Sequence, residues 1–296
     1  MSLPLLVIGH GTRCEAGVTE FDRFLGRLRD QLGPGAEVAG GFIELAPPPL
    51  TEAVGTLAGA GHRRVVALPL VLVSAGHGKG DIPAAIAREQ RRHPEISFSY
   101  GRPLGPHPTL LSLIEARIDA ALDGDSREGT TVVLVGRGST DPDANAELVK
   151  TARLLWEGRG YDSVEPCFIS LASPSVPEVL YRTRLLGARR VVVAPYFLFP
   201  GVLPTRVDIQ TVEYAVDHPD MDVRVADLLG DCAELASLVI ERYREAITGD
   251  IRMNCDTCLY RAPLPGHESR VGAPQIPHHH PDDPVAHNHH HRLRTI

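Results

Sequence analysis

The sequence predicts an α/β protein built from two duplicated domains, each a parallel sheet flanked by helices. Three observations support this prediction. Apolar stretches of strand length alternate with amphipathic stretches of helix length, and the strand-like stretches are rich in Val, Leu and Ile with little polar alternation. The whole pattern then recurs at an offset of 126 or 127 residues on the printed sequence.

Length and composition narrow the class of protein. The 296 residues are 43% hydrophobic and 23% charged, which fits a globular chain with two domains of ordinary size. A formal net charge of -7 argues against nucleic acid as a partner. The sequence has no long apolar run and does not start like a signal peptide, so we expect a cytoplasmic protein without a membrane partner, either a monomer or a homodimer.

The elements of the first half can be placed in order. Apolar stretches predict strands, and periodic stretches between them predict helices. The expected strands are 5–8, 37–43, 64–71 and 96–100, and the expected helices are 19–32, 49–60, 81–93 and 108–122. A polar linker over 124–129 separates a first domain, 1–123, from a second, 130–248.

The second half restates the first segment by segment. Glycine and proline positions recur with the strands, which indicates a duplicated domain rather than two unrelated ones. The matching pairs are 5–12 with 132–139, 41–46 with 167–172, 61–69 with 187–195, and Asp81-Ile82 with Asp208-Ile209.

Three residues able to bind a metal occur at strand ends of the first half only. His10, Glu44 and His77 each follow a different predicted strand, whereas the repeat has Arg137, Ser170 and a segment without histidine. Because ligands of parallel sheets bind at the carboxyl ends of the strands, these side chains could converge on one cleft. Their loss from the repeat indicates a site, although each residue alone also fits an ordinary loop position.

The donor set suits a divalent first-row metal. Two neutral imidazoles and one carboxylate can bind cobalt, nickel, iron or zinc and leave one side open for a substrate. Glu44 could serve as ligand, as general base, or as both. The glycines around His10, Gly9 and Gly11, allow a sharp turn and the close approach of a flat ligand, or serve the turn alone.

These residues resemble those of the CbiX sirohydrochlorin cobaltochelatases, which are relatives of the class II chelatases. The resemblance covers about residues 3 to 245 and implies two chelatase-like domains. It implies insertion of a divalent metal, Co²⁺ above all, into sirohydrochlorin for cobalamin or sirohaem, without nucleotide hydrolysis. His10 and His77 match the family's metal-binding histidines, and Glu44 matches their acidic partner. The motifs are 9–13, 42–47 and 68–72, followed by Gly76-His77 and Asp81-Ile82-Pro83.

Sirohydrochlorin is a polycarboxylate, so an acidic protein must offer it local positive charge. The candidates are Arg13, Lys79, Arg102 and Arg137, together with the amino ends of helices that follow the strands. For each of these cations, a place on a solvated face is the alternative.

The last segment, 249–296, has a different character. It is rich in Pro, Gly and His, cannot build a core, and is expected to be disordered. Its Cys255 and Cys258 are similar to a pair that long CbiX proteins associate with an iron–sulfur cluster; zinc or an unligated pair are the alternatives. The histidines could bind cobalt or nickel. Alternatives to cobalt insertion are the same reaction with Fe²⁺ or Ni²⁺, or metal storage and delivery.

Overall fold

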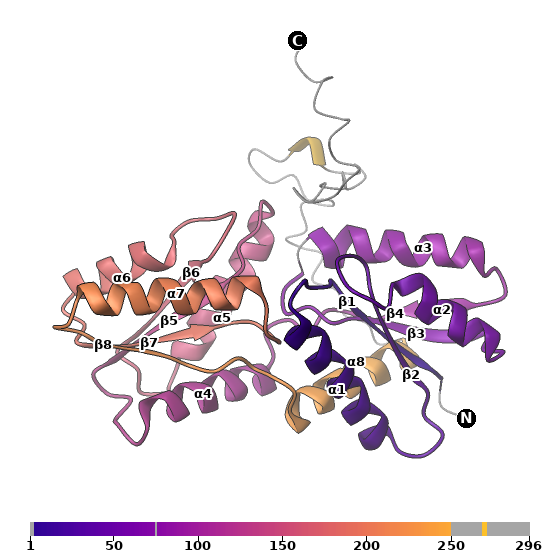
Figure 1. Cartoon of the computed structure of the whole chain (residues 1–296), viewed down its shortest axis with the longest axis horizontal. Helices are drawn as coiled ribbons and strands as arrows, with labels where there is room; N and C mark the ends of the chain where they lie inside the picture. The colour runs from indigo at the N-terminus through magenta and orange to yellow at the C-terminus, as the bar shows by residue number, and fades with distance from the viewer. Residues whose placement is uncertain (1–2, 75, 250–267, 271–296) are drawn as a thin grey trace, which may run out of the picture.

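The computed structural model describes residues 3–74, 76–249 and 268–270. They form two lobes, each around a four-stranded parallel sheet (Figure 1). The strand orders are β2-β1-β3-β4 and β6-β5-β7-β8, so the halves have the same topology. The strands are β1 (Leu5–Gly9), β2 (Val38–Phe42), β3 (Arg64–Pro69), β4 (Ser97–Tyr100), β5 (Thr130–Gly136), β6 (Ser163–Phe168), β7 (Arg190–Pro195) and β8 (Asp222–Val225).

Helices connect the strands, which confirms the predicted duplicated α/β fold. Each half has four α-helices, and the first half adds a short π-helical turn, η1, directly before α3. Their bounds are α1 (Glu15–Leu32), α2 (Leu50–Gly59), η1 (His77–Asp81), α3 (Ile82–Arg92), α4 (Pro108–Leu122), α5 (Pro142–Trp156), α6 (Val176–Leu185), α7 (Val202–Asp217) and α8 (Ala233–Thr248), with a separate turn, η2 (Glu268–Arg270).

The two faces of each sheet bury different cores. On β1, Leu5 and Val7 face one core while Leu6 and Ile8 face another, as the alternation of side chains along a strand requires. The second of these cores lies under α2 and α3, and the corresponding core of the other half lies under α6 and α7. The first core is the largest and is continuous from one half into the other.

This continuity arises because the halves exchange their last helices. Helix α4, from the first half of the sequence, packs against β7, β8 and α5, whereas α8, from the second half, packs against β3, β4 and α1 (Figure 1). Arg224 on β8 donates to the carbonyl of Leu122 at the end of α4 over 2.7 Å, and buried Arg242 on α8 donates to the carbonyl of Leu104 over 3.0 Å. The boundary between the two repeats lies near residue 125 of the sequence, but each packed lobe contains one helix from the other repeat.

Two local expectations differ from the structure. Helix α1 begins at Glu15 rather than at residue 19 and includes Gly17, where a Cβ would lie 2.3 Å from the carbonyl oxygen of Pro200. The glycine thus permits a close approach of the second half to the first turn of α1. The expected match of Ile82 with Ile209 is also not observed, because Ile209 is half exposed whereas Val207 is fully buried like Ile82. Helix α7 therefore aligns with α3 at an offset two residues shorter than expected.

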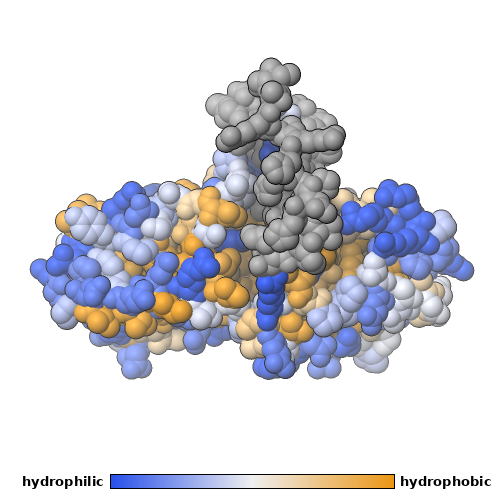
Figure 2. Space-filling model, turned by 45° about the horizontal axis from the view of Figure 1, so that its top comes forward, coloured by the Kyte–Doolittle hydropathy of each residue, from blue (hydrophilic) through white to orange (hydrophobic). Residues whose placement is uncertain are grey.

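The outer helices of the halves also differ in surface character. Figure 2 shows hydrophilic residues over the right-hand end, which is the first half, and several hydrophobic residues on the left-hand lobe. Large exposed apolar side chains lie on or directly after α6 and α7, at Tyr181, Leu185, Leu186, Val202, Ile209, Val212 and Val216. The divergence of the two copies is therefore not limited to the strand ends.

Candidate functional site

The same strand-end turn occurs in both halves. At the end of β1 and β2, the amide of Glu44 donates to the carbonyl of His10 over 3.1 Å, and in the repeat the amide of Ser170 donates to that of Arg137 over 2.9 Å. The residues after Glu44 and Ser170 have φ values of 66° and 60°. A shared backbone frame thus presents different side chains in the two copies.

Glycine is required in both turns because backbone passes close to backbone. Gly11 has a φ of 113°, and a Cβ there would lie 1.7 Å from the carbonyl oxygen of Glu44. Gly138 has a φ of 87°, and its Cβ would lie 1.8 Å from that of Ser170. The glycine after His10 therefore brings the Glu44 backbone against the histidine turn.

His10 and Glu44 form the centre of the candidate site. The Nδ1 atom of His10 lies 3.2 Å from the carbonyl oxygen of Gly11, which can only accept, so Nδ1 carries the proton in the neutral ring. The Nε2 atom lies 2.9 Å from Oε1 of Glu44, with the two side chains 21% and 33% exposed, and a contact this short between a ring nitrogen and a carboxylate oxygen needs a proton between them. A ring held through Nδ1 by a backbone carbonyl, with Nε2 beside a carboxylate, is a donor pair that a metal ion can bind in place of the shared proton.

Arg137 brings positive charge from the second half to this pair. Burial lowers the pKa of the Arg137 guanidinium, and attraction to the Glu44 carboxylate partly offsets that effect. An arginine guanidinium nevertheless stays charged in a protein interior. The residue that replaces the histidine in the repeat therefore faces the carboxylate of the first half.

His77 begins η1, at the carboxyl side of β3, but its side chain lies outside the described part of the structure. Among the described residues, no group of three or more His, Cys, Asp or Glu side chains could hold a metal ion. Two of the three predicted ligands, His10 and Glu44, are thus in contact, and the place of the third is known only for its backbone.

The other predicted cations occupy three different environments. Arg13 is exposed just before α1. The ammonium of Lys79 is buried and forms ion pairs with Asp141 and Asp143 of the second half. Arg102 forms two hydrogen bonds of 2.7 and 2.8 Å with the carboxylate of Glu245 on α8. These acidic partners gave no signal in the sequence, except that Asp141 precedes Pro142 as a helix cap would.

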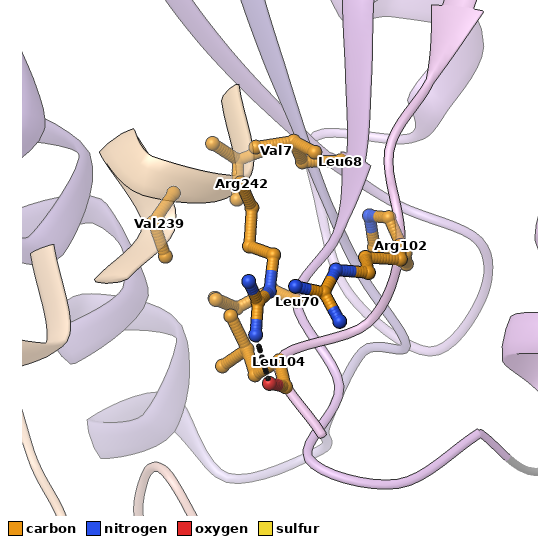
Figure 3. Close-up of a pocket in the computed structure, with 8 residues that line it drawn as sticks. Val7, Leu68, Leu70, Arg102, Leu104, Val239 and Arg242 are labelled. Atoms are coloured by element: carbon orange, nitrogen blue, oxygen red, sulfur yellow. Dashed lines mark hydrogen bonds between the residues drawn. The ribbon is translucent and has the colours of Figure 1, made fainter. Parts of the chain in front are cut away.

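A small cavity lies beside Arg102, under β3 and α8. Figure 3 shows the guanidinium groups of Arg102 and Arg242 pointing toward one another, with Leu70 and Leu104 around them. Burial, and then repulsion from Arg102, lower the pKa of Arg242. The space between these side chains does not admit even a water molecule, whereas sites for organic ligands have volumes of ~300–1,000 Å³. The space therefore belongs to the packing of α8 rather than to a macrocycle site.

The predicted metal-binding groups of the last segment, the cysteine pair and the histidines from 278 on, lie outside the described residues. Cys255 and Cys258 lie outside the described residues, so a cluster or zinc at this pair stays a prediction. In the ranges 3–74 and 76–249, the cysteines Cys14, Cys167 and Cys232 form no disulfide. No helix in the described ranges is long and apolar enough to cross a membrane.

Comparison with known proteins places the chain in a family. The duplicated chelatase-like fold, with a histidine and a carboxylate at the strand ends of one copy, defines the class of protein. The CbiX family model matches residues 4–121 and again 131–246, and the chain belongs to the CbiX family.

Relatives with assigned activities cover most of the chain. A sirohydrochlorin cobaltochelatase of Priestia megaterium is 35% identical over 89% of this chain and 86% of the relative. A sirohydrochlorin ferrochelatase of the same organism is 32% identical over 72% of this chain and 79% of the relative. The structure of SirB from Bacillus subtilis with Fe³⁺ superposes with a TM-score of 0.73 at 28% identity, over 84% of this chain and 97% of that one.

The strand-end turn provides a direct test of the backbone geometry. We expect Gly138→Ala to lower the free energy of unfolding by about 2–4 kcal/mol, because the alanine would combine a positive φ with a backbone clash. Gly26→Ala is the matched control: it lies inside α1 with nothing near its Cβ and should be neutral or stabilising by about 0.5–1 kcal/mol. Thermal and urea unfolding of both variants measure the difference, and equal stabilities would contradict the strained turn.

Proposed function

We propose that this chain inserts a divalent metal ion, Co²⁺ in the first place, into sirohydrochlorin. The observation that carries the proposal is the contact of His10 with Glu44 at the strand ends of the first half, at the positions where the repeat has Arg137 and Ser170. The named activities of the two Priestia megaterium relatives support the substrate. They also keep Fe²⁺ as the alternative metal, since imidazole and carboxylate donors discriminate little between the two.

The proposed roles follow from the chemistry of metal insertion. Two pyrrole N–H protons must leave before the macrocycle can bind the metal, so the site needs metal ligands and a proton acceptor on one side of the ring. His10, through Nε2, and His77 would hold the metal substrate in reach of the macrocycle. Glu44 would complete the ligand set and accept a proton, since its carboxylate already lies in contact with Nε2 of His10.

The macrocycle would lie between the halves, with its carboxylates toward cations. Arg137 reaches the site from the second half, and Arg13 is exposed next to the His10 turn. Lys79 is buried in its ion-pair cluster and Arg102 lies against α8, so we assign the direct contacts with substrate first to Arg13, which is exposed, and to Arg137. Charge-assisted hydrogen bonds of this kind bind and orient a polyanion without taking part in proton transfer.

Glu44→Gln tests the proton acceptor. The amide keeps the shape of the side chain but cannot take up a proton, so the rate of metal insertion should fall by about 100-fold at neutral pH. The absorption change of sirohydrochlorin on metal insertion measures the rate with Co²⁺ and Fe²⁺ in parallel. His10→Ala and His77→Ala should each raise the KM for the metal as well as lower the rate. A wild-type rate in Glu44→Gln would contradict the assigned role.

Arg137→Gln tests the contribution of the second half. We expect the KM for sirohydrochlorin to rise about tenfold, with a smaller change in kcat, because one charge-assisted contact contributes ~1.5–3 kcal/mol. Arg153→Gln is the control, because Arg153 pairs with Glu157 in an exposed position on α5. A KM that is unchanged in Arg137→Gln would remove this residue from the substrate site.

Deletion of residues 263–296 separates the chelatase from a metal-storage protein. A chelatase whose site lies at the ends of the strands should keep its kcat at saturating Co²⁺, whereas a storage protein should lose most of its bound metal and show no turnover in either form. Insertion rates and bound cobalt per chain, measured before and after the deletion, distinguish these cases.

A further inference from the structure

The segment that begins at His77 is fixed to the second half by a buried charged cluster. The Nζ atom of Lys79, in η1, lies 2.8 Å from Oδ2 of Asp141 and 2.7 Å from Oδ2 of Asp143. The three side chains are only 7% to 8% exposed. Asp141 is the N-cap of α5, and its Oδ1 also accepts from the amide of Asp143 over 3.0 Å. The capping bond at the start of α5 therefore orients the carboxylate of Asp141, and Asp143 lies in the first turn of the same helix.

The electrostatics of the cluster keep it intact. Burial alone would lower the pKa of the Lys79 ammonium, but hydrogen bonds and attraction to the two aspartates outweigh burial and place the pKa above its ordinary value. Removal of the ammonium would leave two buried carboxylates without their cation, which is strongly unfavourable. The contact is thus a fixed joint between η1 and α5 under ordinary conditions.

Neighbouring contacts hold the same segment on both sides. The amide of Ser74 donates to Oε2 of Glu147 on α5 over 2.8 Å. The hydroxyl of Tyr100, at the end of β4, donates to the carbonyl of Gly78 over 3.1 Å. The backbone around His77 is therefore anchored to its own sheet by one bond and to the second half by the others. Single π-helical turns such as η1 occur frequently at functional sites.

The duplication supplies an internal comparison. At the α3–α7 offset, the repeat has Val202 in place of His77 and Pro204 in place of Lys79. The residues of the first half that correspond to Asp141 and Asp143 are Cys14 and Ala16. The charged cluster is therefore present next to the segment that carries His77. The equivalent segment of the repeat has no histidine, and the residues that would form such a cluster there are not charged.

We propose that Lys79, held by Asp141 and Asp143, is a positioning residue that fixes the backbone of η1, and with it His77, relative to His10 and Glu44. The second half would then set the geometry of the metal site in the first. This inference rests on the proposed function in one respect, namely that His77 binds the metal substrate. It assigns to Lys79 a role that differs from contact with the substrate carboxylates.

Steady-state kinetics of Lys79→Gln in the full chain separate these roles. Positioning predicts a rise of about tenfold in the KM for Co²⁺, as is typical when a residue that orients a ligand is lost, with an unchanged KM for sirohydrochlorin. Lys79→Arg keeps the charge and should restore most of the affinity. A rise in the KM for sirohydrochlorin alone would overturn the inference and make Lys79 a substrate ligand.

Arg127→Gln is the matched control for the loss of a cation with two carboxylates. Arg127 pairs with Glu115 and Asp119 on α4. This control should lower Tm and leave the KM for Co²⁺ unchanged. If Lys79→Gln likewise lowers Tm and leaves the KM for Co²⁺ unchanged, the role of Lys79 is merely structural and the inference fails.

A double-mutant cycle with Co²⁺ alone tests whether Lys79 acts through His77. Calorimetric titrations measure Co²⁺ binding to the full chain, to Lys79→Gln, to His77→Ala and to the double variant. All four proteins contain the histidine-rich segment, so its contribution to the binding free energy cancels in the cycle. Positioning predicts that Lys79→Gln has no further effect once His77 is removed. Full additivity would overturn the inference, whereas a His77→Ala variant with unchanged affinity would instead overturn the ligand assignment of the proposed function.

Discussion

The structure depends on one large core that the two halves share. Because α4 packs on the second sheet and α8 on the first, neither sheet can bury its inner face with helices from its own half alone. This exchange fixes the carboxyl ends of the two sheets relative to one another. The proposed site between them would therefore have walls from both copies of the repeat, with a geometry set by the packing of the helices.

The duplication separates the requirements of the fold from those of the site. Both copies keep the glycine of positive φ and the close backbone approach at the strand-end turn, as Gly11 and Gly138 show. The side chains on that frame differ: a histidine and a glutamate in one copy, an arginine and a serine in the other. In the proposed function, one scaffold used twice would provide a metal site in one copy and positive charge opposite it in the other, because a metal ion and a polyanionic macrocycle need opposite charges around them.

The fold class, the repeat and the strand ends could be predicted from the sequence because hydrophobic periodicity and glycine positions are local signals. The exchange of α4 and α8 could not be predicted, because the apolar face of an amphipathic helix shows that this face is buried but not against which sheet. The start of α1 at Glu15 could not be predicted either, because the contact of Gly17 with Pro200 joins residues far apart in the sequence. The partners of Lys79 and Arg102 lie far away in the sequence, so these cations could be located but not their environments.

The most direct test of the account is the position of cobalt in crystals of the full chain grown with Co²⁺, located by anomalous diffraction. The account predicts a peak bounded by His10, Glu44 and His77, and none in the equivalent turn at Arg137 and Ser170. A peak between the latter two residues, or an active enzyme without cobalt at the His10 turn, would contradict the central claim that one copy of the repeat carries the metal site.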